Sequence, residues 1–152
     1  MNPGPLSQRI VSDRLSWVER MVGEIQALPL NDRDAFFADH RNIWTAESCL
    51  RRALEALLDL GRHVLAKGFG IAVTEYRDIA VQLQAQGVLS PADGDLLRVL
   101  AGYRNRLVHF YHEIDATELY DICIHHLNDL EQLCAAYRKW LRTHPELLDK
   151  KL

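Results

Sequence analysis

The fold of this chain is decided by the stretch Leu96-Leu97-Arg98-Val99-Leu100-Ala101-Gly102-Tyr103-Arg104-Asn105-Arg106-Leu107-Val108-His109-Phe110. Large apolar residues recur within it at spacings of four, three, four and three, at Leu96, Leu100, Tyr103, Leu107 and Phe110. This is the period of an α-helix with one apolar face. The stretch therefore predicts a helix that turns this stripe towards the core of the protein.

On a helical projection the opposite face carries polar side chains and two small residues, namely Arg98, Ala101, Gly102, Asn105, His109 and His112. Small residues allow another helix to approach closely, and a second copy of the same helix would form a symmetric contact. We therefore expect a homodimer that packs around Ala101 and Gly102.

The helical period extends over most of the chain and predicts an all-α protein. Stop signals at Leu28-Pro29, Gly70, Gly87 and His144-Pro145 divide the pattern into segments. The expected helices span about residues 6–27, 31–67, 75–85, 91–112 and 115–142. Short connections between them favour an up-down bundle of four to five helices. Residues 70–74 form the one candidate strand, and it has no partner.

Two of the expected helices begin with capping signals. Ser90 can accept a hydrogen bond from a free amide of the first turn, and Pro91 fits that turn. Asp115 and Glu118 resemble a capping box in which Asp replaces the usual Ser or Thr.

The length and composition suit one domain. We expect a single helical domain over residues 1–152, with residues 1–5 as a flexible tail. No apolar run approaches the roughly 18–20 residues of a membrane span, and the first residues lack a secretory signal pattern. The three cysteines form no Cys-x-x-Cys pair, which favours reduced thiols in a cytoplasmic protein.

Charge is distributed unevenly around the expected motif helix. The net charge of −3 gives no overall attraction to nucleic acid. Between Asp95 and Glu113, however, there is no acidic residue, whereas Arg98, Arg104 and Arg106 fall inside this interval. The sequence therefore predicts a local positive window suited to contact with RNA.

Arg104 and His109 are the candidate catalytic pair. A guanidinium is a permanent cation whose N–H donors match phosphate oxygens, and an imidazole exchanges a proton near neutral pH. On a regular helix the two residues are about 140° and about 7.5 Å apart, so they do not share a face. Either the helix loosens near His109, or a second copy supplies the complementary half of one cleft.

The string from Arg104 to Tyr111, Arg-Asn-x-Leu-Val-His-x-Tyr, resembles the Arg-x4-His-x-Tyr motif of the HEPN superfamily in its HepT toxin branch. The likeness runs from about residue 43 to 141 and includes residues 53–63, 87–89 and 114–115. It implies a metal-independent endoribonuclease toxin of a prokaryotic, type VII-like toxin–antitoxin system, with RNA as the substrate and no cofactor. It also implies a composite cleft at a dimer interface.

The resemblance assigns roles to individual residues. His109 would act as general acid or base, Arg104 would stabilise charge on the phosphate, and Asn105 would support them. HepT-like proteins are similar in having a minimal nucleotidyltransferase partner, MntA, which silences the toxin by AMPylation of the motif tyrosine, here Tyr111. An anion attached two residues from His109 would block the cleft and compete for Arg104.

Other interpretations remain open at this point. One is a non-catalytic HEPN module that binds a nucleotidyltransferase or its substrate, and another is a plain structural helical dimer. Arg104 could instead form an ordinary surface ion pair, for example with Glu113 or Glu118. A metal site is not expected, because His109 with His112 or Glu113 offers two ligands at most, and a catalytic zinc takes three from the protein.

Overall fold

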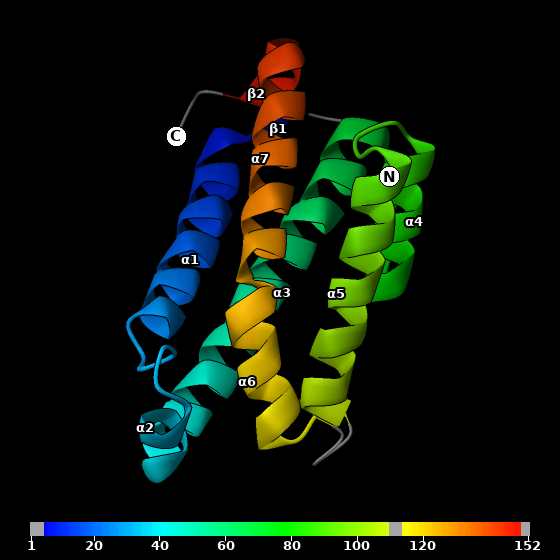
Figure 1. Ribbon diagram of the computed structural model, residues 1–152. Helices are drawn as coiled ribbons and strands as arrows, with labels where there is room; N and C mark the ends of the chain where they lie inside the picture. The colour runs from blue at the N-terminus through cyan, green and yellow to red at the C-terminus, as the bar shows by residue number, and fades with distance from the viewer. Residues whose placement is uncertain (1–4, 110–113, 150–152) are drawn as a thin grey trace.

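The computed structural model describes residues 5–109 and 114–149 of the chain. These residues form seven α-helices and one short 3₁₀-helix, η1, with two very short strands, β1 and β2 (Figure 1). The helices are α1 (Gln8–Gln26), α2 (Arg33–Ala38), α3 (His40–Phe69), α4 (Tyr76–Ala85), α5 (Pro91–His109), α6 (Ala116–His125) and α7 (Leu127–Thr143). The predicted all-α class is confirmed.

Two of the five expected helices are each divided, which accounts for the larger number. The second breaks at Asp39, where the backbone is extended and the Asp39 carboxylate accepts a hydrogen bond from the Arg41 amide at 2.9 Å. The last breaks at His126, whose backbone leaves the helical region. Neither break contains Gly or Pro, so the apolar pattern runs across both without a visible interruption.

The expected helix caps are present. The Ser90 hydroxyl accepts from the Asp93 amide at 3.1 Å, and the Asp115 carboxylate accepts from the Glu118 amide at 2.8 Å. Gly70 ends α3 in the left-handed conformation with φ 67°, which glycine adopts without the strain of a Cβ. These local signals fix the ends of α3, α5 and α6 independently of the tertiary packing.

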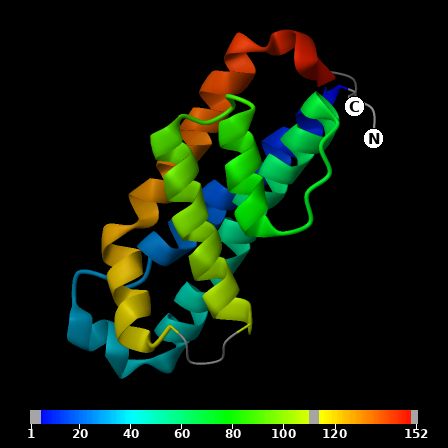
Figure 2. The same cartoon turned by 90° about the vertical axis from the view of Figure 1, so that its right-hand side faces the viewer.

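The central element is α3, the longest helix, and α1, α4, α5 and α7 pack around it (Figures 1 and 2). Packing is closest near Gly61, where an added Cβ would lie 2.8 Å from atoms of Ile79, Leu83 and Tyr137. The fully buried Tyr137 hydroxyl donates to the Leu57 carbonyl at 3.3 Å, and burial raises the pKa of this phenol above its usual value. Glycine at position 61 thus lets α4 and α7 approach α3.

The connection between α3 and α4 does not form a strand (Figure 2). Its carbonyls at Val73 and Thr74 accept hydrogen bonds from Arg62 Nε at 3.1 Å and from the Arg62 terminal amino group at 3.0 Å. The strands lie elsewhere: β1 (Leu6–Ser7) pairs in parallel with β2 (Leu148–Asp149). Periodicity gave no sign of this pairing, because two residues are too few to show alternation.

The core face of α5 differs from the expected stripe. Leu97, Leu100 and Ala101 are buried, with 0–1% of their surface exposed, whereas Leu96 and Tyr103 are only partly buried. The expectation that Ala101 lies on the outward face is therefore wrong. The helix is rotated so that Gly94 and Ala101 face inward, and Gly94 permits the close approach of Gln84 on α4.

Among residues 5–109 and 114–149, no helix combines the length and the apolar character that crossing a bilayer requires.

Candidate active site

Arg104 does not point into solvent but lies across the face where α5 meets α3 and α4. Its side chain is 19% exposed, and its Nε lies 3.6 Å from the Glu55 carboxylate on α3, an ion-pair distance that exceeds a hydrogen bond. One of its terminal nitrogens is 3.3 Å from the Asn105 side-chain oxygen. Glu55 also accepts a hydrogen bond from Arg51 at 3.0 Å, so this carboxylate serves two arginines.

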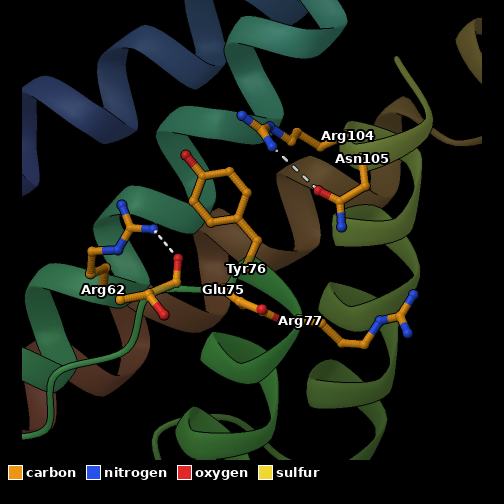
Figure 3. Close-up of a pocket in the computed structure, with 7 residues that line it drawn as sticks. Arg62, Glu75, Tyr76, Arg77, Arg104 and Asn105 are labelled. Carbon is orange, nitrogen blue, oxygen red and sulfur yellow. Dashed lines mark hydrogen bonds between the residues drawn. The ribbon is translucent and has the colours of Figure 1, made fainter. Parts of the chain in front are cut away.

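Tyr76, the first residue of α4, lies between Arg104 and Arg62 (Figure 3). The central guanidinium carbons of Arg104 and Arg62 lie 4.6 Å and 5.0 Å from the centroid of its ring. Its hydroxyl is 3.0 Å from the Asp59 carboxylate, which also accepts from Arg62 at 2.9 Å. Burial and the neighbouring Asp59 charge raise the pKa of the Tyr76 phenol, so the hydroxyl stays protonated and donates to Asp59.

These side chains border a cavity of about 550 Å³, which we term the α3–α4–α5 cavity (Figure 3). Its lining residues come from all three helices and from the connection before α4: Arg62, Thr74, Glu75, Tyr76, Arg77, Arg104 and Asn105. Three of the seven are arginines and one is a glutamate. The cavity is therefore cationic, with a volume in the range of sites that hold a nucleotide-sized ligand.

The expected positive window on α5 is largely neutralised by ion pairs. Arg98 pairs with Asp95 of the same helix, and Arg106 contacts Glu118 of α6 with two nitrogens at 2.8 Å and 2.6 Å. Arg104 does form an ion pair, as the alternative interpretation held, but with Glu55 and not with Glu118, which binds Arg106; Glu113, the other suggested partner, lies outside the described residues. Two further arginines line the α3–α4–α5 cavity: Arg62 of α3, which is paired with Asp59, and Arg77 of α4.

His109 is the last residue of α5, which is α-helical without interruption from Pro91. The helix therefore does not loosen between Arg104 and His109. The conformation of the His109 side chain, as well as Tyr111 and His112, lies outside the described residues. Of the predicted pairings, the structure brings Arg104 together with Asn105 and leaves that of Arg104 with His109 as a prediction.

Some of the residues expected on the dimer face of α5 do lie on its outward side. Arg98 is exposed, and Gly102 has no atom within 4 Å of a Cβ placed on it. Val99, on the same side of the helix, is 52% exposed although it is apolar. An outward surface of α5 thus exists around Gly102, without Ala101.

The cysteines lie in the described part of the chain, whereas the side chains weighed as metal ligands, His109, His112 and Glu113, lie outside it. Cys49, Cys123 and Cys134 are free, and burial raises the pKa of Cys123 to about 12 and of Cys134 to about 11. These two thiols are therefore protonated and unreactive at neutral pH. Within residues 5–109 and 114–149, no three His, Cys, Asp or Glu side chains lie close enough together to hold a metal ion.

Four residues of the site were not predicted from the sequence: Glu55, Arg62, Tyr76 and Arg77. All four reach Arg104 or its cavity through the packing of α3 and α4 on α5, which no local pattern encodes. The pair Arg51 and Glu55, four residues apart on one helix, was the one available signal for a carboxylate held among arginines.

The fold and the site together define a class: a helical bundle with a cationic cavity beside the second half of one helix. The family profile described as Ribonuclease HepT-like matches residues 18–137. This chain therefore belongs to the HepT-like ribonuclease family.

Curated relatives and solved structures agree with this assignment. The chain is 27% identical over 124 residues to the mRNA nuclease HepT of Shewanella oneidensis, covering 81% of this chain and 92% of the relative. It is 24% identical over 112 residues to the tRNA nuclease HepT of Aphanizomenon flos-aquae, covering 73% and 76%.

The solved structures support the fold. One is a tri-AMPylated HEPN toxin of Shewanella oneidensis in complex with an MNT antitoxin, with a TM-score of 0.77, 24% identity and coverage of 86% of this chain and 97% of that one. Another is YutE of Bacillus subtilis, a cytosolic protein of unknown function, with a TM-score of 0.75, 21% identity and coverage of 97% and 98%.

Proposed function

We propose that this protein is a cytoplasmic, metal-independent endoribonuclease that acts as the toxin of a toxin–antitoxin pair. The observation that carries the proposal is the position of Arg104. Arg104 borders a cationic cavity, and it lies on the helix that ends at His109. The chain itself belongs to the HepT-like ribonuclease family. The named relatives are nucleases for mRNA and tRNA, which supports RNA as the substrate here.

In the proposed reaction a ribose 2′-hydroxyl attacks the adjacent phosphorus. The new O2′–P bond forms as the P–O5′ bond breaks, which leaves a 2′,3′-cyclic phosphate and a 5′-hydroxyl. A proton leaves the attacking hydroxyl and a proton reaches the departing oxygen, and His109 performs one of these transfers. Arg104 stabilises the charge that develops on the phosphate oxygens, and Asn105 orients its guanidinium from 3.3 Å.

Two copies of the chain would complete the cleft. Because α5 is regular up to His109, about 140° of helix rotation separates this residue from Arg104 within one copy. We propose a symmetric dimer through the outward surface of α5 around Gly102, flanked by Arg98 and the exposed Val99. Within such a dimer, the two copies of the motif would border one composite cleft.

Silencing is proposed to act on Tyr111. A relative of similar fold is an AMPylated toxin in complex with an MNT antitoxin, which supports a nucleotidyltransferase as the partner of this chain. In this transfer the Tyr111 oxygen would bond to the α-phosphorus of ATP as the bond to the β-phosphate breaks, with release of pyrophosphate and the phenol proton. The attached AMP would place an anion two residues from His109, next to the proposed cleft. Replacing Tyr111 with Phe should preserve cleavage but make it resistant to the nucleotidyltransferase with ATP. Modification of another residue in peptide mass spectrometry would contradict this part of the proposal.

The central experiment is RNA cleavage by the purified protein in the presence of EDTA. We expect activity to persist and the products to end in a 2′,3′-cyclic phosphate or its hydrolysis product. His109→Ala should lower the rate by about a hundredfold or more, the scale of a lost general acid or base. Loss of activity in EDTA, or full activity in His109→Ala, would overturn the mechanism. Absence of cleavage with retained binding to the nucleotidyltransferase would instead support a non-catalytic module.

The dimer is tested by a matched pair of glycine substitutions. Gly102 on α5 and Gly23 on α1 both have no atom within 4 Å of an added Cβ, so the start of a side chain is not obstructed at either position within one copy. Gly102→Phe should weaken both the dimer in light scattering and the cleavage rate, whereas Gly23→Phe should leave both unchanged. A monomeric wild-type protein with full activity would refute the composite cleft.

A further inference from the structure

The three arginines of the α3–α4–α5 cavity differ in what they already bind. All three side-chain nitrogens of Arg62 are engaged, with the Val73 and Thr74 carbonyls and with Asp59. Arg104 contacts Glu55 and the Tyr76 ring. Within the described part of the chain, Arg77 makes no ion pair or hydrogen bond, and it is exposed on the cavity wall. Arg62 therefore builds the wall, whereas Arg77 has donors left for a ligand.

The position of Arg77 is unfavourable for its own helix. It is the second residue of α4, in the turn where the helix dipole favours anions and disfavours cations. The Glu75 residue that precedes α4 provides no side-chain cap. Arg77 therefore contributes nothing visible to the stability of α4, and its side chain extends away from Arg62 (Figure 3).

The cavity continues directly from the proposed reaction site. Arg104 and Asn105 line it together with Arg77, and Tyr76 and Arg62 form a wall with internal partners. A volume of about 550 Å³ exceeds what one phosphate needs and fits one nucleotide unit. A polyanionic strand held at Arg104 would thus meet a second cation at Arg77.

We infer that the α3–α4–α5 cavity is an RNA subsite, in which Arg77 binds a backbone phosphate next to the one held by Arg104. This inference rests on the proposed ribonuclease function. It adds a residue that determines how many nucleotides of the strand the protein binds. The phosphate contact is independent of base identity, because guanidinium donors address only the phosphate oxygens. The subsite should therefore increase affinity for RNA without selecting a sequence.

The test measures binding of short 2′-deoxy oligonucleotides, which lack the attacking hydroxyl, so that the result does not depend on cleavage. A dinucleotide with one phosphate is compared with a tetranucleotide with three. Arg77→Glu should weaken tetranucleotide binding by about tenfold and dinucleotide binding by less than about twofold. Arg14→Glu is the matched control, since Arg14 is an exposed arginine of α1 without an ion pair in the described residues.

Two further readouts separate a subsite from a general charge effect or a folding defect. Arg77→Gln should reduce the slope of log affinity against log salt by about 0.7, the value for one phosphate contact on a single strand. Arg77→Glu should keep or raise the melting temperature, because a carboxylate suits the first turn of α4. Equal losses for Arg77→Glu and Arg14→Glu, or equal losses on both oligonucleotides, would overturn the subsite. If His109→Ala loses cleavage but Arg77→Glu binds the tetranucleotide as tightly as the wild type, the subsite is refuted and the proposed ribonuclease function is not.

Discussion

The surroundings of Gly61 and of Arg104 are built on the same two helices, α3 and α4, yet they differ in kind. Around Gly61 the contacts are with Ile79, Leu83 and Tyr137, and every one of these side chains is buried. Around Arg104 the contacts are with Glu55 and Tyr76, and they end at an open cationic cavity. The buried side of the α3–α4 contact at Gly61 therefore supplies stability, and the open side at Arg104 holds polar groups in fixed positions. Substitutions in the two regions should affect different measurements.

The largest effect is expected from Arg104→Ala, which should lower the RNA cleavage rate by about a hundredfold or more. The fold should survive, because Glu55 keeps its hydrogen bond with Arg51 and is not left as an isolated charge. Arg104→Lys should not restore the rate, since an ammonium lacks the planar fork of donors. Circular dichroism and single-turnover kinetics check these outcomes. A variant that retains wild-type kinetics would exclude Arg104 from the reaction.

Gly61→Ala should act on stability instead. Its Cβ would lie 2.8 Å from three neighbouring atoms, so the substitution should lower the free energy of unfolding by about 1–3 kcal/mol. Gly23→Ala on α1 meets no atom within 4 Å and should raise stability by about 0.5–1 kcal/mol. Urea unfolding measures both. Equal changes in the two variants would show that the contact at Gly61 relaxes easily.

Tyr76 lies between the two regions, and two substitutions separate its contacts. Tyr76→Leu removes the ring beside Arg104 and should reduce the cleavage rate by about three- to tenfold, through less precise placement of the guanidinium. Tyr76→Phe keeps the ring, loses only the 3.0 Å hydrogen bond to Asp59, and should stay within about twofold of the wild type. A larger loss for Phe than for Leu would show that the hydroxyl, not the ring, positions Arg104.

The smallest effect concerns His63, whose Nε2 accepts a hydrogen bond from the Ser7 amide at 3.1 Å. Burial, with Lys67 and Arg14 nearby, lowers the pKa of His63 below its usual 6.5, so the unfolded chain binds the proton more readily. The stability from this group is full above pH 6.5 and falls as the pH drops through the lowered pKa. His63→Gln can accept the same hydrogen bond without titrating. Its melting temperature should fall less than that of the wild type between about pH 7.5 and pH 5.5.

The fold was largely predictable because its signals are local. Apolar periodicity located the helices, and Ser90, Asp115 and Gly70 marked their ends through side-chain caps and backbone conformation. The breaks at Asp39 and His126 were missed, because each is a single residue that leaves the helical region without Gly or Pro. Local sequence thus predicts which segments are helical better than where a long helix bends.

The site was less predictable, because its geometry depends on packing. A helical projection weights large residues, so it placed Leu96 and Tyr103 in the core and Ala101 outside. In the structure, Ala101 is buried and Gly94 lies against Gln84 of α4, while Arg104 is directed towards Glu55 and Tyr76. The motif residues were identified by resemblance, but the carboxylate and ring that hold Arg104 come from distant segments, and the spacing of Arg51 and Glu55 gave no sign that Glu55 lies beside Arg104.

The parallel pairing of Leu6–Ser7 with Leu148–Asp149 has a topological consequence. It joins the two ends of the described chain at the end of the bundle where α1 begins and α7 finishes, while α5 runs to the opposite end (Figure 1). A short linker between these strands would allow a circular permutant. The new ends could be opened in the exposed turn at Gln86–Gly87, which interrupts neither the helix of Arg104 nor that of Tyr76. Fluorophores or affinity tags on either strand would likewise lie at the end of the bundle opposite the end of α5. The unpermuted protein could therefore be immobilised through β1 or β2 while the C-terminal end of α5 stays accessible to RNA.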